Sequence, residues 1–169
     1  MRTAIAVLIL AILATASANA GTIGDWSDDT YTEGLYAATV NDSGNLLGQY
    51  CNTANSTCFW MIALKTGCKA ESKYPILVNS DIGAHSLEVY CGGEIKNGYH
   101  RYFFTNFDAI DNLVKNSTRI GFAAPLQGDQ FQVVRFSLSG ARATIDRIRA
   151  AAAEGSNKPV RSDTRDQRL

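Results

Sequence analysis

The segment from Leu46 to Leu64 reads LLGQYCNTANSTCFWMIAL, and it decides the fold. Two apolar runs flank a polar connection, Asn52 to Thr57, and each run meets that connection at a cysteine. The second run, Cys58 to Leu64, is too short for an ordinary helix and carries aromatic residues that suit a pleated surface. It is therefore predicted to be a central strand, buried on both faces.

The four cysteines are Cys51, Cys58, Cys68 and Cys91. In an exported protein an even number indicates disulfides, and four cysteines allow three pairings. We favour Cys51 with Cys58 and Cys68 with Cys91, because the first bond would close the end of a hairpin. A zinc site would need close thiol pairs such as C-x2-C, which these spacings do not provide, so no metal site is predicted.

Residues 1–20 show the layout of a secretory signal peptide. Arg2 precedes an apolar run from Ala4 to Ala14, and small residues follow up to Ala20. The apolar run is about half the ~20 residues that a membrane-spanning helix needs, so no integral membrane span is expected. The mature protein is expected to be periplasmic or secreted.

Residues 21–154 fit a single β-rich domain, and residues 155–169 are predicted to be a disordered tail because they contain almost no apolar side chains. The chain has 16 basic and 16 acidic residues. This balance gives no long-range field that would collect polyanions, so nucleic acid is excluded as an expected partner.

Alternating and turn-forming residues place further strands on both sides of the opening segment. Pro75 limits the strand near it to a short one, and Asn97-Gly98 suits a type I′ turn, with Gly92-Gly93 as a bulge. The other expected strands are Tyr31–Val40, Leu46–Cys51, Ile76–Val78, Ser86–Cys91, His100–Phe107, Ile120–Ala124 and Phe131–Leu138, with turns at Asn41–Asn45 and Gly128–Asp129.

Two segments have helical periodicity. A short helix is expected from Asp108 to about Lys115, and a longer one is expected after Ser139, which can cap it. The expected buried positions are Ile110, Leu113 and Val114 in the first helix and Ala141, Ile145, Ile148 and Ala152 in the second, with Arg142, Asp146 and Arg149 on the side facing away. The predicted fold class is α+β: a mainly antiparallel sheet or sandwich of about seven strands with these two helices.

No residue pattern indicates catalysis. His85 and His100 lack metal-ligand spacing and are interpreted as surface residues. Asp108 and Asp111 could share a helix face, but acids near a helix start are explained by capping and the helix dipole. No catalytic residue and no cofactor are therefore predicted.

Aromatic residues are dense at Tyr99, Tyr102, Phe103 and Phe104. Strand alternation places Tyr102 and Phe104 on one face and Phe103 on the other. One face should belong to the core, and the other is the candidate binding surface.

The layout resembles the invasion-associated locus B family of small exported bacterial proteins. The resemblance rests on Tyr50-Cys51, Cys58-Phe59 and the run Phe136-Ser-Leu-Ser-Gly140 that leads into the alanine-rich segment up to Ala153. It implies a periplasmic or surface-associated, β-sandwich-like domain without known catalytic residues, and it spans about Tyr50 to Ala153.

The leading hypothesis is an exported, non-enzymatic binding protein of the bacterial cell envelope that recognises another protein or an envelope component. An alternative is an inhibitor of a hydrolase such as lysozyme, and a protruding polar loop such as Asn52 to Thr57 would then be the element to mutate. A further alternative is a small secreted enzyme that uses His85 or His100.

Overall fold

The computed structural model describes residues 21–125 and 131–156. The predicted signal peptide, the predicted turn at Gly128–Asp129 and the tail beyond Ser156 lie outside these residues. Gly155 and Ser156 belong to the last helix and not to the tail. No helix within the described residues is long and apolar enough to cross a bilayer.

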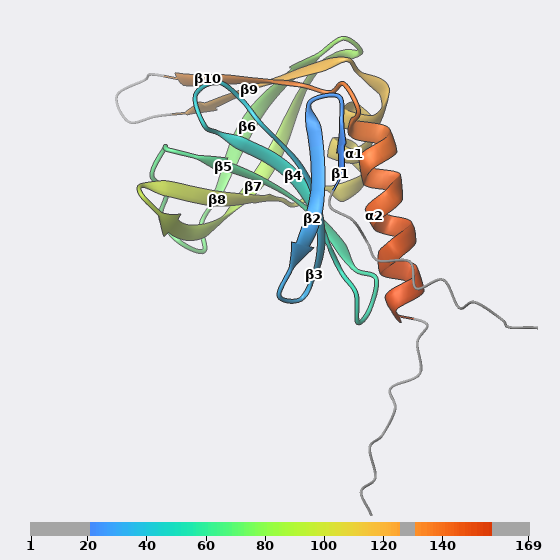
Figure 1. Cartoon of the computed structure of the whole chain (residues 1–169). Coiled ribbons are helices and arrows are strands. Elements are labelled where there is room, and N and C mark those ends of the chain that lie inside the picture. Colours follow the sequence, from blue (N-terminus) through green and yellow to red (C-terminus); the bar gives the residue numbers. More distant parts are fainter. Residues whose placement is uncertain (1–20, 126–130, 157–169) are drawn as a thin grey trace, which may run out of the picture.

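The strands form one antiparallel sheet in the order β1-β2-β3-β4-β5-β8-β7-β6-β9-β10 (Figure 1). Antiparallel character, two helices and two disulfides agree with the prediction, but the sheet has ten strands instead of about seven. The strands are β1 Gly21–Ile23, β2 Trp26–Tyr31, β3 Gly34–Val40, β4 Leu46–Asn52, β5 Cys58–Leu64, β6 Lys73–Ser80, β7 Gly83–Lys96, β8 Tyr99–Phe104, β9 Arg119–Pro125 and β10 Phe131–Ser137.

The underestimate arose from strands whose side chains are mostly polar. β2 reads WSDDTY and most of its side chains reach solvent, so it lacks the apolar alternation that marks a half-buried strand. β6 extends well beyond Ile76–Val78 in spite of Pro75. It pairs with β9 only from Leu77 to Ser80, so one side of the strand has no partner at Pro75, where a residue without an N–H is tolerated.

The β7–β8 hairpin has the predicted local geometry. Asn97 and Gly98 both have positive φ, at 54° and 76°, as a type I′ turn requires. The strand register shifts between Cys91 and Glu94, where Gly93 has a φ of 83°, so the predicted bulge is confirmed. β8 ends at Phe104 and not at Phe107, because the side chain of Asn106 caps the helix that follows.

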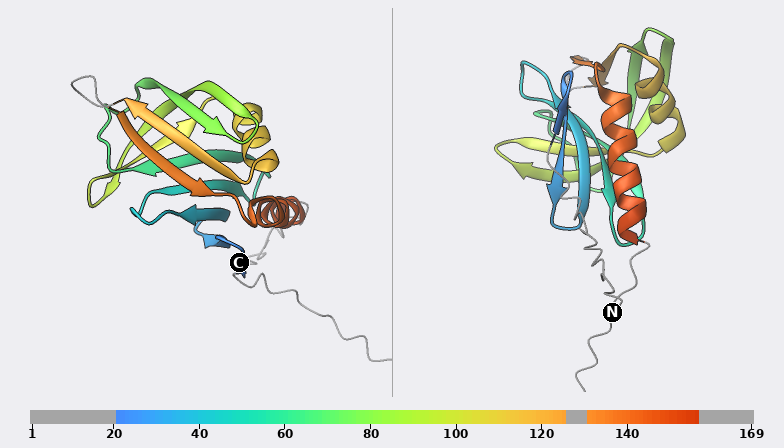
Figure 2. Two further views of the ribbon diagram at one scale, coloured as in Figure 1. Left: turned by 90° about the horizontal axis from the view of Figure 1, so that it is seen from above. Right: turned by 45° about the vertical axis from the view of Figure 1, so that its right-hand side comes forward.

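The sheet curls so that its two halves face each other, and the left view of Figure 2 shows the blue-to-teal strands opposite the green-to-orange ones. The core lies between the halves and includes Trp26 and Trp60, whose rings meet edge to face at 6.2 Å. The curl brings β10 back toward β2 and β3. Trp26 donates its indole N–H to the Ser137 carbonyl, and the Asn41 amide donates to the Arg135 carbonyl.

Helix α1 spans Phe107–Asn116 and α2 spans Ala141–Ser156. Their predicted buried positions are confirmed, and α2 also buries Thr144. α2 lies along strands β1 to β4, as Figure 1 shows. Ser139 is not the predicted cap: its carbonyl accepts from Asp25, and Gly140, with a φ of 87°, makes the entry into the helix.

Candidate recognition surface on the sheet

Both favoured disulfides are present. Cys51 and Cys58 lie directly opposite each other on β4 and β5, with Cα atoms 4.0 Å apart. Cys68, in the connection before β6, is bonded to Cys91 of β7. The first bond holds the β4–β5 hairpin in one register, and a one-residue slip would move every side chain to the opposite face of the sheet.

The residues next to this disulfide form stacked aromatic pairs. Tyr50 lies opposite Phe59 on β5 and opposite Tyr36 on β3. The Tyr50 and Phe59 ring centroids are 5.4 Å apart with an interplanar angle of 7°, and those of Tyr36 and Tyr50 are 5.6 Å apart at 26°. Three neighbouring strands therefore contribute one continuous stack.

Two further rings extend the stack. Tyr31 of β2 meets Tyr50 edge to face at 5.7 Å, and Phe103 of β8 meets Phe59 in the same manner at 5.4 Å. We call Tyr31, Tyr36, Tyr50, Phe59 and Phe103 the aromatic ladder. It lies on the outer face of the sheet, away from the core; Phe59 is 37% exposed and the other four are half-buried.

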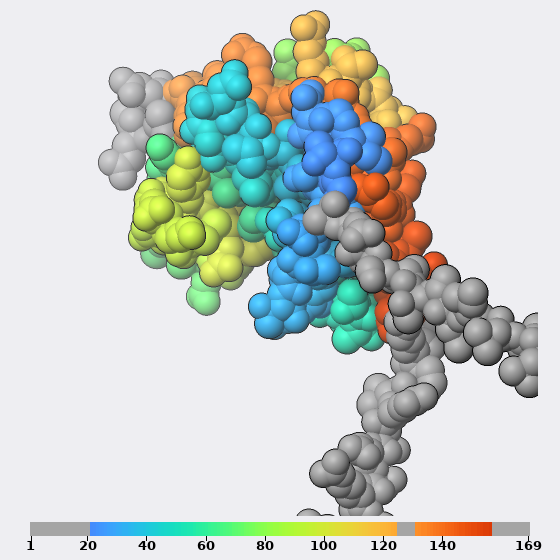
Figure 3. Space-filling view, viewed as in Figure 1, coloured from blue at the N-terminus to red at the C-terminus, as the bar shows by residue number. Residues whose placement is uncertain are grey.

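The ring orientations determine which parts of the rings a ligand can contact. In the stacked part, ring faces are turned toward one another, so that ring edges are left for contact. At the far end, the Phe103 ring lies over Gly92, where an added Cβ would come within 2.3 Å of the ring. In Figure 3, strands β2 to β4 and the β7–β8 hairpin all reach the surface on the side of the molecule in view.

The ladder's central hydroxyl stays protonated well into the alkaline range. Burial, together with smaller effects of the neighbouring Tyr36 and Tyr31, raises the pKa of Tyr50 to about 12. Burial, followed by the charge of Glu33, also raises the pKa of Tyr31. At neutral pH the ladder therefore presents neutral phenol groups that can donate hydrogen bonds.

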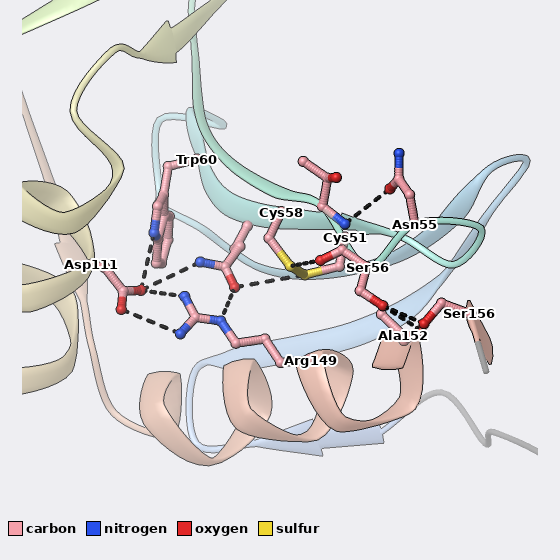
Figure 4. Close-up of a disulfide and its surroundings, with 11 residues drawn as sticks. Cys51, Asn55, Ser56, Cys58, Trp60, Asp111, Arg149, Ala152 and Ser156 are labelled. Atoms are coloured by element: carbon pink, nitrogen blue, oxygen red, sulfur yellow. Dashed lines mark hydrogen bonds and ion pairs between the residues drawn. A yellow bond between two sulfur atoms is a disulfide. The ribbon is translucent and has the colours of Figure 1, made fainter. Parts of the chain in front are cut away.

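The opposite face of the same hairpin carries a polar cluster (Figure 4), in which the Asp111 and Arg149 side chains are half-buried. Arg149 of α2 donates through Nε to Gln49 Oε1 at 2.7 Å and through both Nη atoms to the Asp111 carboxylate of α1. Trp60 donates its indole N–H to Asp111 at 3.2 Å. Asp111 thus joins α1 to α2, and Arg149 points inward instead of lying on the predicted outer side of its helix.

The four aromatic residues of the predicted surface separate into different environments. Tyr102 and Phe104 are only 5% and 7% exposed and belong to the core, so they cannot form a surface. Phe103 is part of the ladder. Tyr99 lies apart from it, with Lys65 Nζ 5.3 Å from the centre of its ring. Only Phe103 and Tyr99 of the predicted set reach the outer face.

The two histidines are not brought together. His85 lies exposed near the start of β7, whereas His100 is paired with Glu94 near the other end of that strand. The side-chain contact of His100 is with the Gly98 carbonyl at 3.3 Å. Within residues 21–125 and 131–156, no three histidine, cysteine or acidic side chains are grouped as a metal site would require.

The polar connection Asn52 to Thr57 does not stand free of the domain. Ser56 Oγ contacts Ser156 Oγ at 2.6 Å and donates to the Ala152 carbonyl, so the connection is bound to the end of α2. Asn52 and Asn55 use their side-chain oxygens to hold the turn itself. Ala54, Asn55 and Thr57 are nevertheless exposed, so an inhibitory role of this loop stays a prediction.

Sequence reasoning missed four of the five ladder residues, although the favoured disulfide contained the necessary signal. A bond between directly opposed cysteines places Tyr50, which precedes the first, opposite Phe59, which follows the second. Tyr36 then follows from the predicted hairpin with its turn at Asn41–Asn45. Tyr31 could not be placed because β2 was not recognised.

No protein-family model matches the sequence, and no curated protein matches it either. Among solved structures, the chain is similar to the crystal structure of invasion associated protein B from Bartonella henselae. The TM-score is 0.59 and the sequence identity 14%, and the match covers 79% of this chain and 98% of that chain. The resemblance found in the sequence is thus confirmed as a shared fold.

Proposed function

We propose that this chain is an exported, non-enzymatic binding protein and that the aromatic ladder is its contact surface for a partner protein. The observation that carries the proposal is the continuous row of five partly exposed rings across β2, β3, β4, β5 and β8. Tyrosine and phenylalanine are enriched in protein interfaces, where they supply large contact areas.

The ring orientations favour a protein over a glycan or a cationic ligand. A quaternary ammonium group binds above a ring face, and the apolar C–H face of a sugar ring would also need an open aromatic face. The faces of Tyr36, Tyr50 and Phe59 are turned to one another within the stack. Ring edges and phenol hydroxyls are what a partner can reach, and a protein surface can supply both apolar contact and hydrogen-bond acceptors.

The ladder is also held rigid before a partner arrives. The Cys51–Cys58 disulfide holds the register of the central rings, and α2 packs against the opposite side of the strands that carry them. Side chains that are ordered in the free protein lose little entropy on association, which increases the affinity for a given contact area.

The proposal can be tested by photo-crosslinking in envelope extract. A benzophenone amino acid replaces Phe59, and in a parallel sample it replaces Phe131, which is 59% exposed and lies outside the ladder. We expect a defined protein adduct from position 59 only. We also expect Tyr36→Ala to abolish capture by the purified domain, because Tyr36 is one end of the stacked part.

Two outcomes would contradict the proposal. One is capture that survives Tyr36→Ala but is lost in Phe131→Ala, because the contact would then lie elsewhere on the sheet. The other is turnover of an envelope polymer by the purified domain that is lost in a His85→Ala, His100→Ala double variant, which would favour an enzyme. Identification of the captured partner as a hydrolase, with inhibition of it, would refine the binding role to that of an inhibitor.

A further inference from the structure

The outer face of the sheet is hollowed over β6, β7, β9 and β10, far along the strand order from the ladder. The hollow has a volume of about 810 Å³. It forms because β9 presents Gly121 and Ala123 between the larger side chains of its neighbours. Leu77 of β6 is 54% exposed there, and Val133 of β10 is 52% exposed. A hollow of this size is typical of sites for small molecules or short peptides.

Two arginines stand at one end of this hollow. Arg135 lies opposite Gly121 in the β9–β10 register, so Arg119, two residues before Gly121, is its diagonal neighbour on the same face. The Arg135 stem lies over Gly121, with Cγ 3.6 Å from the position a Cβ would take. The side chain of Arg119 is 83% exposed. Two guanidinium groups on one face can bind a single anionic group between them.

The acidic groups near these two arginines leave both guanidinium groups able to bind an anion. Asp81 contacts Arg119 Nε at 3.3 Å, but its carboxylate also accepts from the Thr118 hydroxyl and backbone N–H. The Thr118 hydrogen bonds are the main reason why the pKa of Asp81 lies below its usual value. Among the described residues, no carboxylate pairs with the Arg135 side chain. The rim is therefore net cationic.

The remaining wall of the hollow is polar. Asn79 of β6 and Ser86 of β7 line it on the outer face. A hydrocarbon chain lying there would cover these groups without satisfying their hydrogen bonds, which is unfavourable. A peptide backbone offers N–H and C=O groups to the same side chains, so the polar wall favours a peptide over a fatty acid.

We propose that this hollow binds the C-terminal end of a partner polypeptide. The terminal carboxylate lies between Arg119 and Arg135, and an apolar side chain of the peptide packs on Leu77, Ala123 and Val133. The peptide backbone faces the wall formed by Asn79 and Ser86. This site is independent of the aromatic ladder, so either can be tested while the other is left intact.

The test uses a library of fluorescein-labelled tetrapeptides whose last two residues are apolar, prepared with free C-terminal carboxylates and, in parallel, as C-terminal amides. Binding to the exported protein is measured by fluorescence polarisation. We expect the free acids to bind at least about tenfold more tightly than the amides, because the amides lose the charge-assisted hydrogen bonds. Arg135→Gln should remove this preference, since it removes one of the two guanidinium groups.

Further variants distinguish peptide binding in the hollow from a general effect of protein charge. Arg142→Gln changes the same charge on the exposed side of α2 and should leave peptide binding unchanged, and Ala123→Phe should abolish binding by filling the hollow. Equal binding of acids and amides, or no binding of either library at millimolar protein, would overturn the proposal. Displacement of bound peptide by laurate but not by unlabelled peptide acids would also overturn it, in favour of a lipid.

Discussion

The two faces of the β4–β5 hairpin are built from neighbouring residues but have opposite environments. Tyr50 and Phe59 lie on the outer face, whereas Gln49 and Trp60, adjacent to them in the chain, lie fully buried on the inner face. On the inner face, polar atoms are hydrogen-bonded to α1 and α2. On the outer face, the rings of Tyr50 and Phe59 stack on each other and stay partly exposed.

Under the proposed function, the inner face of the hairpin stabilises the fold and the outer face contacts the partner. Burial and a satisfied polar cluster stabilise the inner side, and truncation there leaves cavities or unpaired charges. Ring edges on the outer side remain accessible. The same disulfide holds both sides in place, because the register of the hairpin decides which residue faces which way.

Among the substitutions that test the two faces, Trp60→Ala should lower the free energy of unfolding the most. The side chain is fully buried in contact with Trp26, and its removal should lower the free energy of unfolding by about 4 kcal/mol. Urea unfolding followed by far-UV circular dichroism would measure the loss. A loss no larger than that of Phe59→Ala, the adjacent outward substitution, would contradict the assignment of the two faces.

Asp111→Ala should follow, with a loss of about 3 kcal/mol in the free energy of unfolding. It leaves the two Nη atoms of Arg149 and the Trp60 indole N–H without their shared acceptor, while Arg149 Nε keeps Gln49. Asp146→Ala, which removes only an exposed partner of Lys115, is the matched control and should cost well under about 1 kcal/mol. Similar losses in both variants would show that the hydrogen bonds of the cluster contribute no more to stability than an exposed ion pair.

Replacement of both Cys51 and Cys58 by alanine should lower the free energy of unfolding by about 2 kcal/mol, since the closed loop is short. The same change should weaken partner capture by the ladder, because the register of its central rings is no longer fixed. Removal of the Cys68–Cys91 bond serves as the comparison: it should affect stability but leave capture intact. If partner capture is unchanged in the Cys51, Cys58 variant, the ladder does not depend on this disulfide for binding.

Alkaline pH should reduce stability through Tyr50 and Tyr102. Burial raises the pKa of both to about 12 from an ordinary value of 10.0. Between these values the unfolded chain releases phenolic protons that the folded chain retains, so stability is complete below pH 10 and falls as the pH rises through 12. Each tyrosine should account for about 1 kcal/mol by pH 11.

The contribution of Tyr50 to the loss of stability at alkaline pH can be measured by urea unfolding at pH 8 and pH 11. Tyr50→Phe is compared with the unsubstituted protein. The decrease in the free energy of unfolding between the two pH values should be smaller in the variant. Ultraviolet titration at 295 nm gives a direct check. A Tyr50 hydroxyl that ionises near pH 10 would mean that the outer face is more open than the ladder geometry implies.

Phe59→Ala should have the smallest effect on stability, about 1 kcal/mol, because the ring keeps substantial exposure and loses only two aromatic contacts. Its effect on partner capture should be much larger than its effect on unfolding. A loss of capture without a loss of fold, measured on the same sample, is the result that distinguishes a recognition surface from an ordinary part of the sheet.

Local chemistry allowed much of the fold to be predicted from the sequence. The Asn97-Gly98 turn, the buried stripe of α1 and both disulfides follow from short-range patterns. β2 was missed because Asp28 and Asp29 interrupt any apolar alternation. Arg149 was placed on the wrong side of α2 because periodicity gives the direction of a side chain but not its long-range partner, Asp111.

The candidate site was predicted only in part, for a related reason. Alternation correctly separated Phe103 from Tyr102 and Phe104, yet it could not say which face was buried. The ladder draws on five strands, and its order depends on β8 lying beside β5, which no local pattern reveals. Residues that meet through strand order instead of through sequence distance need the three-dimensional topology to be recognised.

The two disulfides also determine how the chain would respond to mechanical tension. They join residues 7 and 23 positions apart, so a force applied at the ends cannot extend the segments between the bonded cysteines. These segments would add roughly 100 Å of contour length if they were released. When such a domain is unfolded by force, its contour length increases less than its number of residues suggests.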